Sequence, residues 1–279
     1  FAVSKLRRIT DEKKAGHTGT LDPNATGVLP VALGGATRFI ELLPTHKKAY
    51  LATFKTGVCT DTLDIWGEVT STCDKQVGFS DVLKASEKFK GEIMQLPPMY
   101  SALKKDGVRL YELARQGKEV EREPRKCEIY ELTVEEGENG EYSLYCECSA
   151  GTYIRTLISD IGDELGTGAV MTSLNRTFAC GVELKDCYTL EELADLKEKN
   201  QLEKALIPVD KLMECYPAVN VTENQAIRFK NGGDLMSQRV RGLKEFGLYR
   251  VYGSGEFLGL GEYTQGSESL KVKRVYIGR

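Results

Sequence analysis

Residues 16–30 read GHTGTLDPNATGVLP, a run in which three glycines and two prolines surround one histidine and one aspartate. Glycine adopts backbone angles that other residues avoid, and proline fixes its own φ angle. A stretch this rich in both predicts a shaped loop in place of a helix or a strand. Asp22 stands directly before Pro23, where the backbone favours extended geometry. We expect the loop to present Asp22 on a stiff support, as proteins commonly present catalytic side chains.

A tight surface turn, in which Asp22 caps its own backbone, is the alternative interpretation of this run. Residue chemistry alone does not separate the two interpretations. A nucleotide-binding P-loop is excluded, because that motif needs Gly-Lys-Ser or Gly-Lys-Thr after its last glycine and the sequence contains neither.

The chain has 279 residues, of which 41% are hydrophobic and 28% charged, and this composition is typical of a folded protein with a sizeable core. The length predicts one large domain or two. No run of about 18 apolar residues occurs, so no membrane span is predicted. No secretory signal is visible either, and because the sequence starts at Phe1 we expect that an N-terminal piece has been removed.

Eight cysteines are scattered along the chain without a C-x-x-C pair, and His17 and His46 are the only histidines. Zinc sites need cysteine and histidine ligands at short, regular spacings, so no metal site is predicted. Cysteines outside a short secreted framework are typical of the reducing cytosol. We therefore expect a cytoplasmic protein.

The net charge of −3 argues weakly against a nucleic-acid partner, but partner choice depends on local patches. Basic residues gather in four segments, at residues 5–14, 47–48, 104–109 and 271–274. One such segment is more typical of a solvated face than of a binding patch. Four of them beside the motifs described here favour a phosphate-rich ligand.

Hydrophobic spacing predicts interleaved helices and strands. Helices are expected over residues 1–14, 36–43, 80–90 (with Ser80 as its cap), 108–116 and 154–165, and after the capping boxes at Thr189 and Thr222. Strands are expected over residues 50–56, 129–134 and 142–148. Hairpin turns outnumber helical crossovers, which predicts an α+β fold with a mixed, largely antiparallel sheet flanked by helices.

The pattern changes after residues 208–217. Short strands broken by glycines are expected over residues 247–252, 257–261 and 270–277, and they predict a small β-barrel appended to the main domain. We place the boundary between residues 212 and 213.

The run GHTGTLDPNATGVLPVALGGATR at residues 16–38 resembles the signature of the bacterial TruB family, the tRNA pseudouridine 55 synthases. Four further blocks are similar to segments of that family: KKAY at 47–50, TDTLD at 60–64 followed by Gly67, QLPPMYSALK at 95–104 and SAGTYIRTL at 149–157. Together these blocks cover most of the first 210 residues. Family members begin with a strand that contains a Lys-Pro pair ahead of the position of Phe1, and this sequence lacks that strand.

The resemblance implies the pseudouridine synthase fold, with residues 1–212 as the catalytic domain and residues 213–279 as a PUA-like RNA-binding domain. It implies isomerisation of uridine 55 in the T-loop of tRNA. This reaction breaks one bond and rejoins the base through carbon, without a redox step, so no cofactor is expected. The implied partner is the T-stem-loop of tRNA. We expect a monomer that needs no protein partner and no membrane.

The resemblance also assigns roles to residues. Asp22 matches the nucleophilic carboxylate, which could attack either carbon 6 of the uracil or carbon 1′ of the ribose. Arg155 matches the arginine that favours the ionised carboxylate when it lies within a few ångströms. Tyr50 matches an active-site tyrosine, whose ring can stack on the uracil and whose hydroxyl can help to move the proton from carbon 5. Taken alone, Arg155 could be a helix-surface arginine and Tyr50 a core tyrosine.

Three further residues match substrate-binding positions, namely His17, Tyr153 and Leu174. His17 could instead be a core histidine satisfied by backbone groups, but its place in a loop beside Asp22 favours a substrate contact, whereas Leu174 taken alone would be a core residue. A uridine inside a folded loop must be extruded before it can react, and contacts to phosphates offset that cost. The candidates for these RNA contacts are Lys104, Lys105, Lys271, Lys273 and Arg274.

Two other functions are weighed against this one. A tRNA-binding or RNA-folding module without chemistry is the alternative. A hydrolase with Asp61 and Asp64 as paired carboxylates is disfavoured, because both lie in a turn-like segment without a matched acid nearby. We expect these two aspartates to brace a loop.

Overall fold

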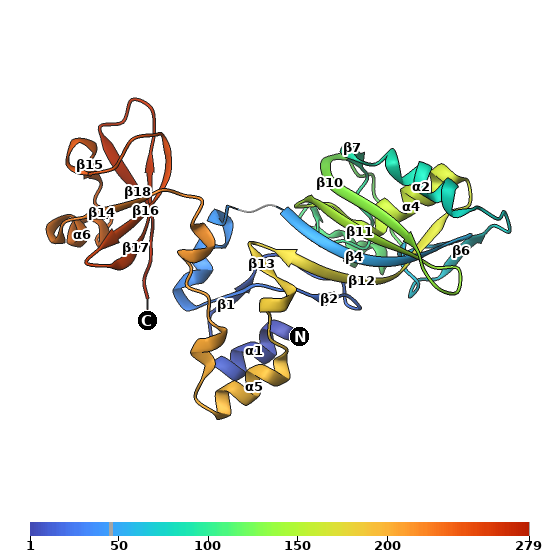
Figure 1. Cartoon of the computed structure of the whole chain (residues 1–279), viewed down its shortest axis with the longest axis horizontal. Coiled ribbons are helices and arrows are strands. Elements are labelled where there is room, and N and C mark those ends of the chain that lie inside the picture. The colour runs from blue at the N-terminus through green and yellow to red at the C-terminus, as the bar shows by residue number, and fades with distance from the viewer. Residues whose placement is uncertain (45–46, 279) are drawn as a thin grey trace. The chain divides into compact units, whose positions relative to one another are not determined.

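The computed structural model describes residues 1–44 and 47–278, which form two compact units (Figure 1). The first, which we call the sheet unit, comprises residues 20–29 and 46–186. The second, the terminal unit, comprises residues 1–19, 30–45 and 187–279.

A seven-stranded sheet forms the centre of the sheet unit. Its main path is β13 (Val182–Glu183), β12 (Ala169–Ala179), β4 (Lys47–Thr56), β11 (Tyr142–Ser149), β10 (Arg125–Glu136) and β7 (Gly91–Gln95). These strands pair antiparallel, and the short β2 (Thr26–Gly27) pairs parallel with β12. The predicted mixed, largely antiparallel sheet of an α+β fold is confirmed.

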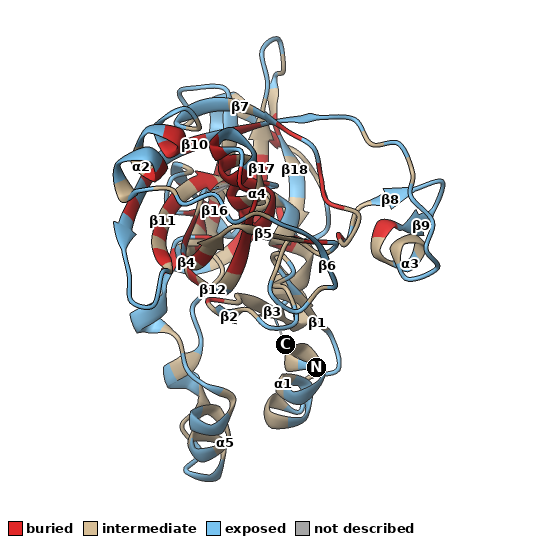
Figure 2. Cartoon of the chain, turned by 90° about the vertical axis from the view of Figure 1, so that its right-hand side faces the viewer, coloured by how far each residue is buried: buried red, intermediate tan, exposed pale blue. Residues whose placement is uncertain are grey.

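Alternation along β11 and along β4 from Tyr50 onward buries one face of the sheet, which is why Ala52, Phe54, Leu144 and Cys146 have no exposed surface. Helices α2 (Phe79–Glu87) and α4 (Ile154–Leu165) pack against each other, α2 against β10 and α4 against β12 and β4 (Figure 1). The buried residues concentrate on α4 and the strands beside it (Figure 2). Each buried aliphatic side chain contributes about 1.5–3 kcal/mol, so this face fixes the position of α4.

The helix predicted over 154–165 has these bounds, and it ends at Gly166 in the left-handed region with φ 68°. Three other predictions were partly wrong. Ser80 does not cap α2; the helix starts after Gly78, whose N–H donates to the Asp81 carboxylate. The segment 36–43 is a 3-10 helix, η1 (Gly34–Leu42). Only Leu110–Ala114 (α3) of the expected 108–116 helix is helical, because Val108–Arg109 (β9) pairs with Lys104–Lys105 (β8).

Short elements complete the sheet unit. A hairpin of β5 (Val58–Thr60) and β6 (Val69–Thr72) lies beside β12, and η2 (Leu184–Asp186) follows β13.

In the terminal unit, α1 (Ala2–Thr10) packs against α5 (Leu190–Glu198), and β1 (Ala15–His17) pairs with β3 (Val31–Leu33). The capping box predicted at Thr189 is present at the start of α5. Two 3-10 turns follow, η3 (Leu202–Ala205) and η4 (Lys211–Met213).

The C-terminal segment forms a five-stranded sheet in the order β14 (Ala218–Val221), β16 (Gly247–Gly253), β17 (Glu256–Tyr263), β18 (Ser269–Val275) and β15 (Leu235–Met236), with η5 (Ser237–Arg239) after β15. Helix α6 (Glu223–Lys230) starts at the predicted Thr222 cap, and its Phe229 is buried in the small core. Within the described residues the edge strands β14 and β15 are not paired with each other, so the sheet is an open half-barrel.

The ring of Phe39, in η1, is fully buried in the terminal unit. Its centroid lies 5.9 Å from that of Phe257 and 5.8 Å from that of Tyr276. Across residues 1–44 and 47–278, no helix is both long and apolar enough to span a bilayer.

Candidate active site

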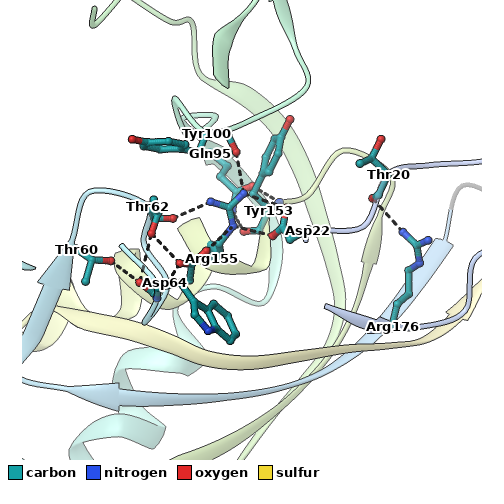
Figure 3. A network of polar contacts seen from close by, with 11 residues as sticks. Thr20, Asp22, Thr60, Thr62, Asp64, Gln95, Tyr100, Tyr153, Arg155 and Arg176 are labelled. Carbon is teal, nitrogen blue, oxygen red and sulfur yellow. Dashed lines mark hydrogen bonds and ion pairs between the residues drawn. The ribbon is translucent and has the colours of Figure 1, made fainter. Parts of the chain in front are cut away.

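Arg155, on the first turn of α4, is the centre of a polar cluster in the sheet unit (Figure 3). Its Nε donates to Oδ2 of Asp22 at 2.7 Å, and its Nη2 donates to Oδ1 at 3.1 Å. On the other side, Nη1 donates to the carbonyl of Thr62 at 2.7 Å and Nη2 to that of Tyr100 at 2.8 Å. A guanidinium bound in this two-pronged way fixes the plane of the carboxylate as well as its position.

Asp22 is held from one side and open on the other. The Arg155 side chain is 5% exposed, whereas that of Asp22 is 34% exposed. The backbone N–H of Ala25 donates to the Asp22 carbonyl at 3.0 Å, which closes a turn around Pro23. The loop therefore presents one anchored carboxylate to an incoming group, the geometry that nucleophilic attack requires.

A second carboxylate faces the same guanidinium. Oδ2 of Asp64 lies 3.9 Å from Nε of Arg155, and this side chain is mostly buried. Its Oδ1 accepts hydrogen bonds from Oγ1 of Thr62 at 2.7 Å and from the backbone N–H of Trp66 at 3.2 Å. Asp61 holds the same turn, because it accepts from the N–H of Glu68 and from the hydroxyl of Tyr100. Both aspartates thus stabilise the turn in which they lie.

Gln95 fixes the start of the helix that carries Arg155. This side chain is almost fully buried. Its Nε2 donates to the carbonyl of Tyr153 at 3.0 Å, and the N–H of Tyr153 donates to its Oε1 at 2.7 Å. Tyr153 immediately precedes α4, so this amide pair sets the position of Arg155 two residues later.

Arg176, on β12, holds the loop that contains Asp22. This buried side chain donates from Nε to the carbonyl of Val28 at 2.8 Å. Its Nη1 donates to the carbonyl of Thr20 at 3.4 Å (Figure 3). The N–H of Val28 in turn donates to the carbonyl of Arg176 at 2.8 Å. Gly27 has a φ of +106°, and a Cβ there would lie 2.2 Å from the same carbonyl oxygen. Only glycine permits this approach, which fastens both ends of the Thr20–Leu29 loop to one strand.

Tyr50 lies on β4 opposite Arg176. Burial raises the pKa of its hydroxyl to about 12, although the charge of Arg176 and a hydrogen bond to it act in the opposite direction. The hydroxyl is therefore neutral at physiological pH. Leu174 lies opposite Ala52 in the same pair of strands, and it packs in the core cluster with Tyr50.

Asp22 and Arg155 are in direct contact, and the Gln95 side chain holds Tyr153 at the start of the helix that carries Arg155. Tyr50 is linked to the Asp22 loop through Arg176. His17 is exposed at the end of β1 in the terminal unit, and His46 lies outside the described residues. The roles predicted for these residues stay predictions.

Within the described residues, none of the contacts given above for Asp22 and Arg155 involves a predicted RNA-contact residue. Lys104 and Lys105 are exposed on the β8–β9 hairpin. Lys271 and Lys273 are exposed on β18, where Lys273 pairs with Glu262 at 3.0 Å, and Arg274 is partly buried. They stay predictions as well.

Sequence reasoning missed the positioning groups. Gln95, Thr62 and Tyr100 fall inside the quoted blocks, but two of them act through backbone carbonyls, which leave no signal in a sequence. Arg176 did leave a signal in the sequence, because a charged residue between Leu174 and Phe178 is unusual in a buried strand.

Three family models together match nearly the whole chain. They are the TruB family pseudouridylate synthase N-terminal domain (residues 7–154), the tRNA pseudouridylate synthase B C-terminal domain (155–214) and the pseudouridine synthase II TruB C-terminal domain (217–276).

Curated relatives and solved structures agree with these matches. The chain is 43% identical to tRNA pseudouridine synthase B of Dechloromonas aromatica, over 95% of this chain and 87% of that protein. It is 40% identical to tRNA pseudouridine synthase B of Clostridium tetani, over 99% of this chain and 94% of that protein.

Among solved structures, a Cbf5–Nop10–Gar1 complex contains a chain with a TM-score of 0.74 and 28% identity, covering 99% of this chain and 80% of that one. An H/ACA ribonucleoprotein bound to a substrate RNA containing 2′-deoxyuridine gives a TM-score of 0.73 at 27% identity, covering 100% and 81%. The fold is therefore that of the pseudouridine synthases, with a PUA-like C-terminal half-barrel. On these matches, the chain belongs to the TruB family of pseudouridylate synthases.

Proposed function

We propose that this chain converts a uridine of tRNA into pseudouridine, with Asp22 as the nucleophile. The observation that carries the proposal is the Asp22 carboxylate, one-third exposed and gripped on its other side by the buried Arg155. Family membership and relatives named tRNA pseudouridine synthase B support tRNA as the substrate. Uridine 55 of the T-loop is the site that the family assignment favours.

The chemistry fits the residues of the cluster. Attack by Asp22 forms a covalent bond to the substrate, the bond between N1 of the base and carbon 1′ of the ribose breaks, and the turned base rejoins the sugar through carbon 5; the bond to Asp22 breaks again, which restores the carboxylate. The proton on carbon 5 then leaves, and N1 carries a proton in the product, so atoms and electrons balance. Arg155 orients the carboxylate throughout, and Asp64 holds Arg155 from the side.

Tyr50 acts in this proposal as a neutral phenol. With a pKa of about 12, its hydroxyl takes up the proton from carbon 5 while it passes its own proton on toward N1 of the turned base, so the phenol is neutral before and after the step. Tyr153, Leu174 and His17 are proposed to contact the substrate.

The remaining expectations belong to the same proposal. Residues 1–212 are the catalytic domain and 213–279 the RNA-binding domain. The basic residues at 104–105 and 271–274 contact phosphates of the T-stem-loop. The enzyme works as a cytoplasmic monomer, without a cofactor or a protein partner.

The test uses the full chain and a T-arm stem-loop RNA labelled with tritium at carbon 5 of the target uridine. The parent should release tritium, whereas Asp22→Asn and Asp22→Ala should release none above background, since neither side chain can attack. Both variants should bind the RNA within about threefold of the parent in a filter assay.

Asp163→Asn is the matched control, because Asp163 is an exposed aspartate on the same helix as Arg155 and should keep full activity. Turnover by Asp22→Asn within tenfold of the parent would refute the nucleophile. Binding by the parent without any tritium release would instead favour the RNA-binding module.

A further inference from the structure

Trp66 is the only tryptophan of the chain, and 52% of its surface is exposed. It lies in the turn between β5 and β6, the same turn that contains Thr62 and Asp64. An indole is among the most apolar side chains, so leaving it in water forgoes a large burial gain. Tryptophan is also the residue type most enriched at binding hot spots.

The turn that carries Trp66 is rigid. Oγ1 of Thr60 donates to the Asp64 carbonyl at 2.7 Å, and the N–H of Ile65 donates to the Met171 carbonyl at 2.9 Å, which ties the turn to β12. The next residue must be glycine, because a Cβ on Gly67 would lie 2.2 Å from Oγ1 of Thr62. The ring of Trp66 is therefore presented from a fixed backbone, which lowers the entropy cost of binding a ligand to that ring.

A short chain of contacts links this backbone to the proposed nucleophile. The N–H of Trp66 donates to Oδ1 of Asp64 at 3.2 Å. The other oxygen of Asp64 lies 3.9 Å from Nε of Arg155, which donates to Asp22 at 2.7 Å. An exposed aromatic ring thus stands on the turn that supports the catalytic cluster.

The charges around Trp66 select the kind of ligand. Asp61 and Glu68, in the same turn, are both exposed, and they repel a phosphate. Ile65 beside it is uncharged and 48% exposed. The turn therefore offers a neutral aromatic face in an acidic setting, which suits the flat face of a nucleobase and not the sugar-phosphate backbone.

We propose that Trp66 is a stacking platform for an unpaired nucleobase of the RNA loop that contains the target uridine. This inference rests on the proposed function, since extruding the uridine removes the stacking partner of its neighbours. An indole can replace that partner, and stacking on an aromatic side chain tolerates any base because every base has a π-face.

The sole tryptophan makes the test direct, because fluorescence excited on the long-wavelength edge of the protein absorption, where the 13 tyrosines do not absorb, reports on Trp66 alone. Full-length Asp22→Asn, which binds without turnover, is titrated with the T-arm stem-loop RNA. Stacking predicts fluorescence quenching that saturates with the Kd measured by filter binding. A fully paired duplex RNA of the same length should leave the fluorescence within 10% or so of its starting value.

Variants give the second readout in the same Asp22→Asn background. Trp66→Ala should weaken binding of the stem-loop about 5- to 150-fold, the range that base–aromatic stacking covers. Trp66→Phe should recover part of that loss because it keeps a ring. Ile65→Ala is the matched control, an exposed apolar neighbour without a ring, and should bind within twofold of the Asp22→Asn protein.

Several results would overturn the inference. They are unchanged fluorescence while the filter assay shows saturation, equal quenching by duplex RNA, or Trp66→Ala binding within twofold of Asp22→Asn. If the parent still forms pseudouridine under any of these results, the stacking role alone fails. If the stem-loop neither binds nor reacts, both the proposed function and the stacking role fail.

Discussion

The side chain of Arg155 shows why one residue type is required at the centre of the cluster. Its four hydrogen bonds run to two carboxylate oxygens and two carbonyls in three separate segments of the chain. A planar guanidinium presents five donors in a fixed fork, whereas a lysine presents one compact ammonium. Family resemblance predicted the partner of Asp22, but the two carbonyl acceptors depend on backbone geometry and could not be predicted.

The buried hydroxyl of Tyr50 leads to a prediction about pH. With a pKa of about 12, only about one phenol in a thousand is ionised at pH 9. If the neutral phenol is the active form, ionisation of Tyr50 should not make the single-turnover rate rise tenfold per pH unit between pH 6 and 9. Tyr50→Phe should lower that rate about 10²- to 10⁴-fold, because it keeps the ring and removes the proton relay.

Rapid-quench measurements with the T-arm stem-loop test this, with Tyr145→Phe as control, since Tyr145 lies on the neighbouring strand β11 but outside the core cluster. A rate that climbs tenfold per pH unit in the parent, and stays flat in Tyr50→Phe, would show that the phenolate is the active form.

At the level of elements, the Asp22 loop depends on its attachment to β12. Gly27→Ala should disrupt that attachment, since its Cβ would lie 2.2 Å from the Arg176 carbonyl. We expect turnover to fall about 100-fold, the cost of a displacement near 1 Å at a reacting group, while RNA affinity changes little. Steady-state kinetics and filter binding measure the two effects separately.

Gly181→Ala provides the comparison. Gly181 also has a positive φ, of +79°, but no atom of the described residues outside its own neighbours lies within 4 Å of a Cβ there. It should lose about 1 kcal/mol of folding stability from backbone strain and keep its activity. Equal activity in the two variants would mean that the β2–β12 contact does not position Asp22.

The elements differ in how far the sequence predicted them. Helices α4, α5 and α6 were predicted because capping boxes and a terminal glycine are local signals. Strand β12 was not predicted, although it is central to the sheet. Its polar residues have partners distant in sequence: Thr172 and Ser173 hydrogen-bond with Thr53, each at 2.6 Å, and Arg176 holds the Asp22 loop. Such partners exist only in the folded chain.

At the scale of the whole molecule, the net charge of −3 and the proposed RNA ligand lead to a prediction about salt. Binding of the T-arm stem-loop should weaken steeply between about 50 and 200 mM salt, because contacts to phosphates release counterions. Lys271→Gln, at an exposed position on β18, should lower affinity and reduce the salt slope by about one.

Lys185→Gln is the control, because Lys185 is exposed on η2, already pairs with Glu183 at 2.6 Å and belongs to none of the basic segments. Fluorescence anisotropy at four salt concentrations gives the slopes. A Kd that does not depend on salt would contradict phosphate contacts as the main source of affinity.

The division into units could not be predicted from the sequence. The sheet unit takes residues 20–29 from the middle of a hairpin whose strands, β1 and β3, belong to the terminal unit. Sequence reasoning finds boundaries between consecutive segments, and here each unit is built from separate ones. The proposed boundary at residue 212 divides the chain at a single position, whereas the chain passes from one unit to the other several times.

Phe39 gives this interleaving an energetic consequence. Its ring belongs to the N-terminal part of the sequence, yet the rings packed on it come from Phe257 on β17 and from Tyr276, the residue after β18. Truncation of the chain after residue 212 would expose the Phe39 ring to water and would lower the free energy of unfolding by about 1.5–3 kcal/mol. The C-terminal half-barrel is therefore a cofolding partner of the chain's beginning, and not a detachable accessory that could be lost or exchanged without penalty.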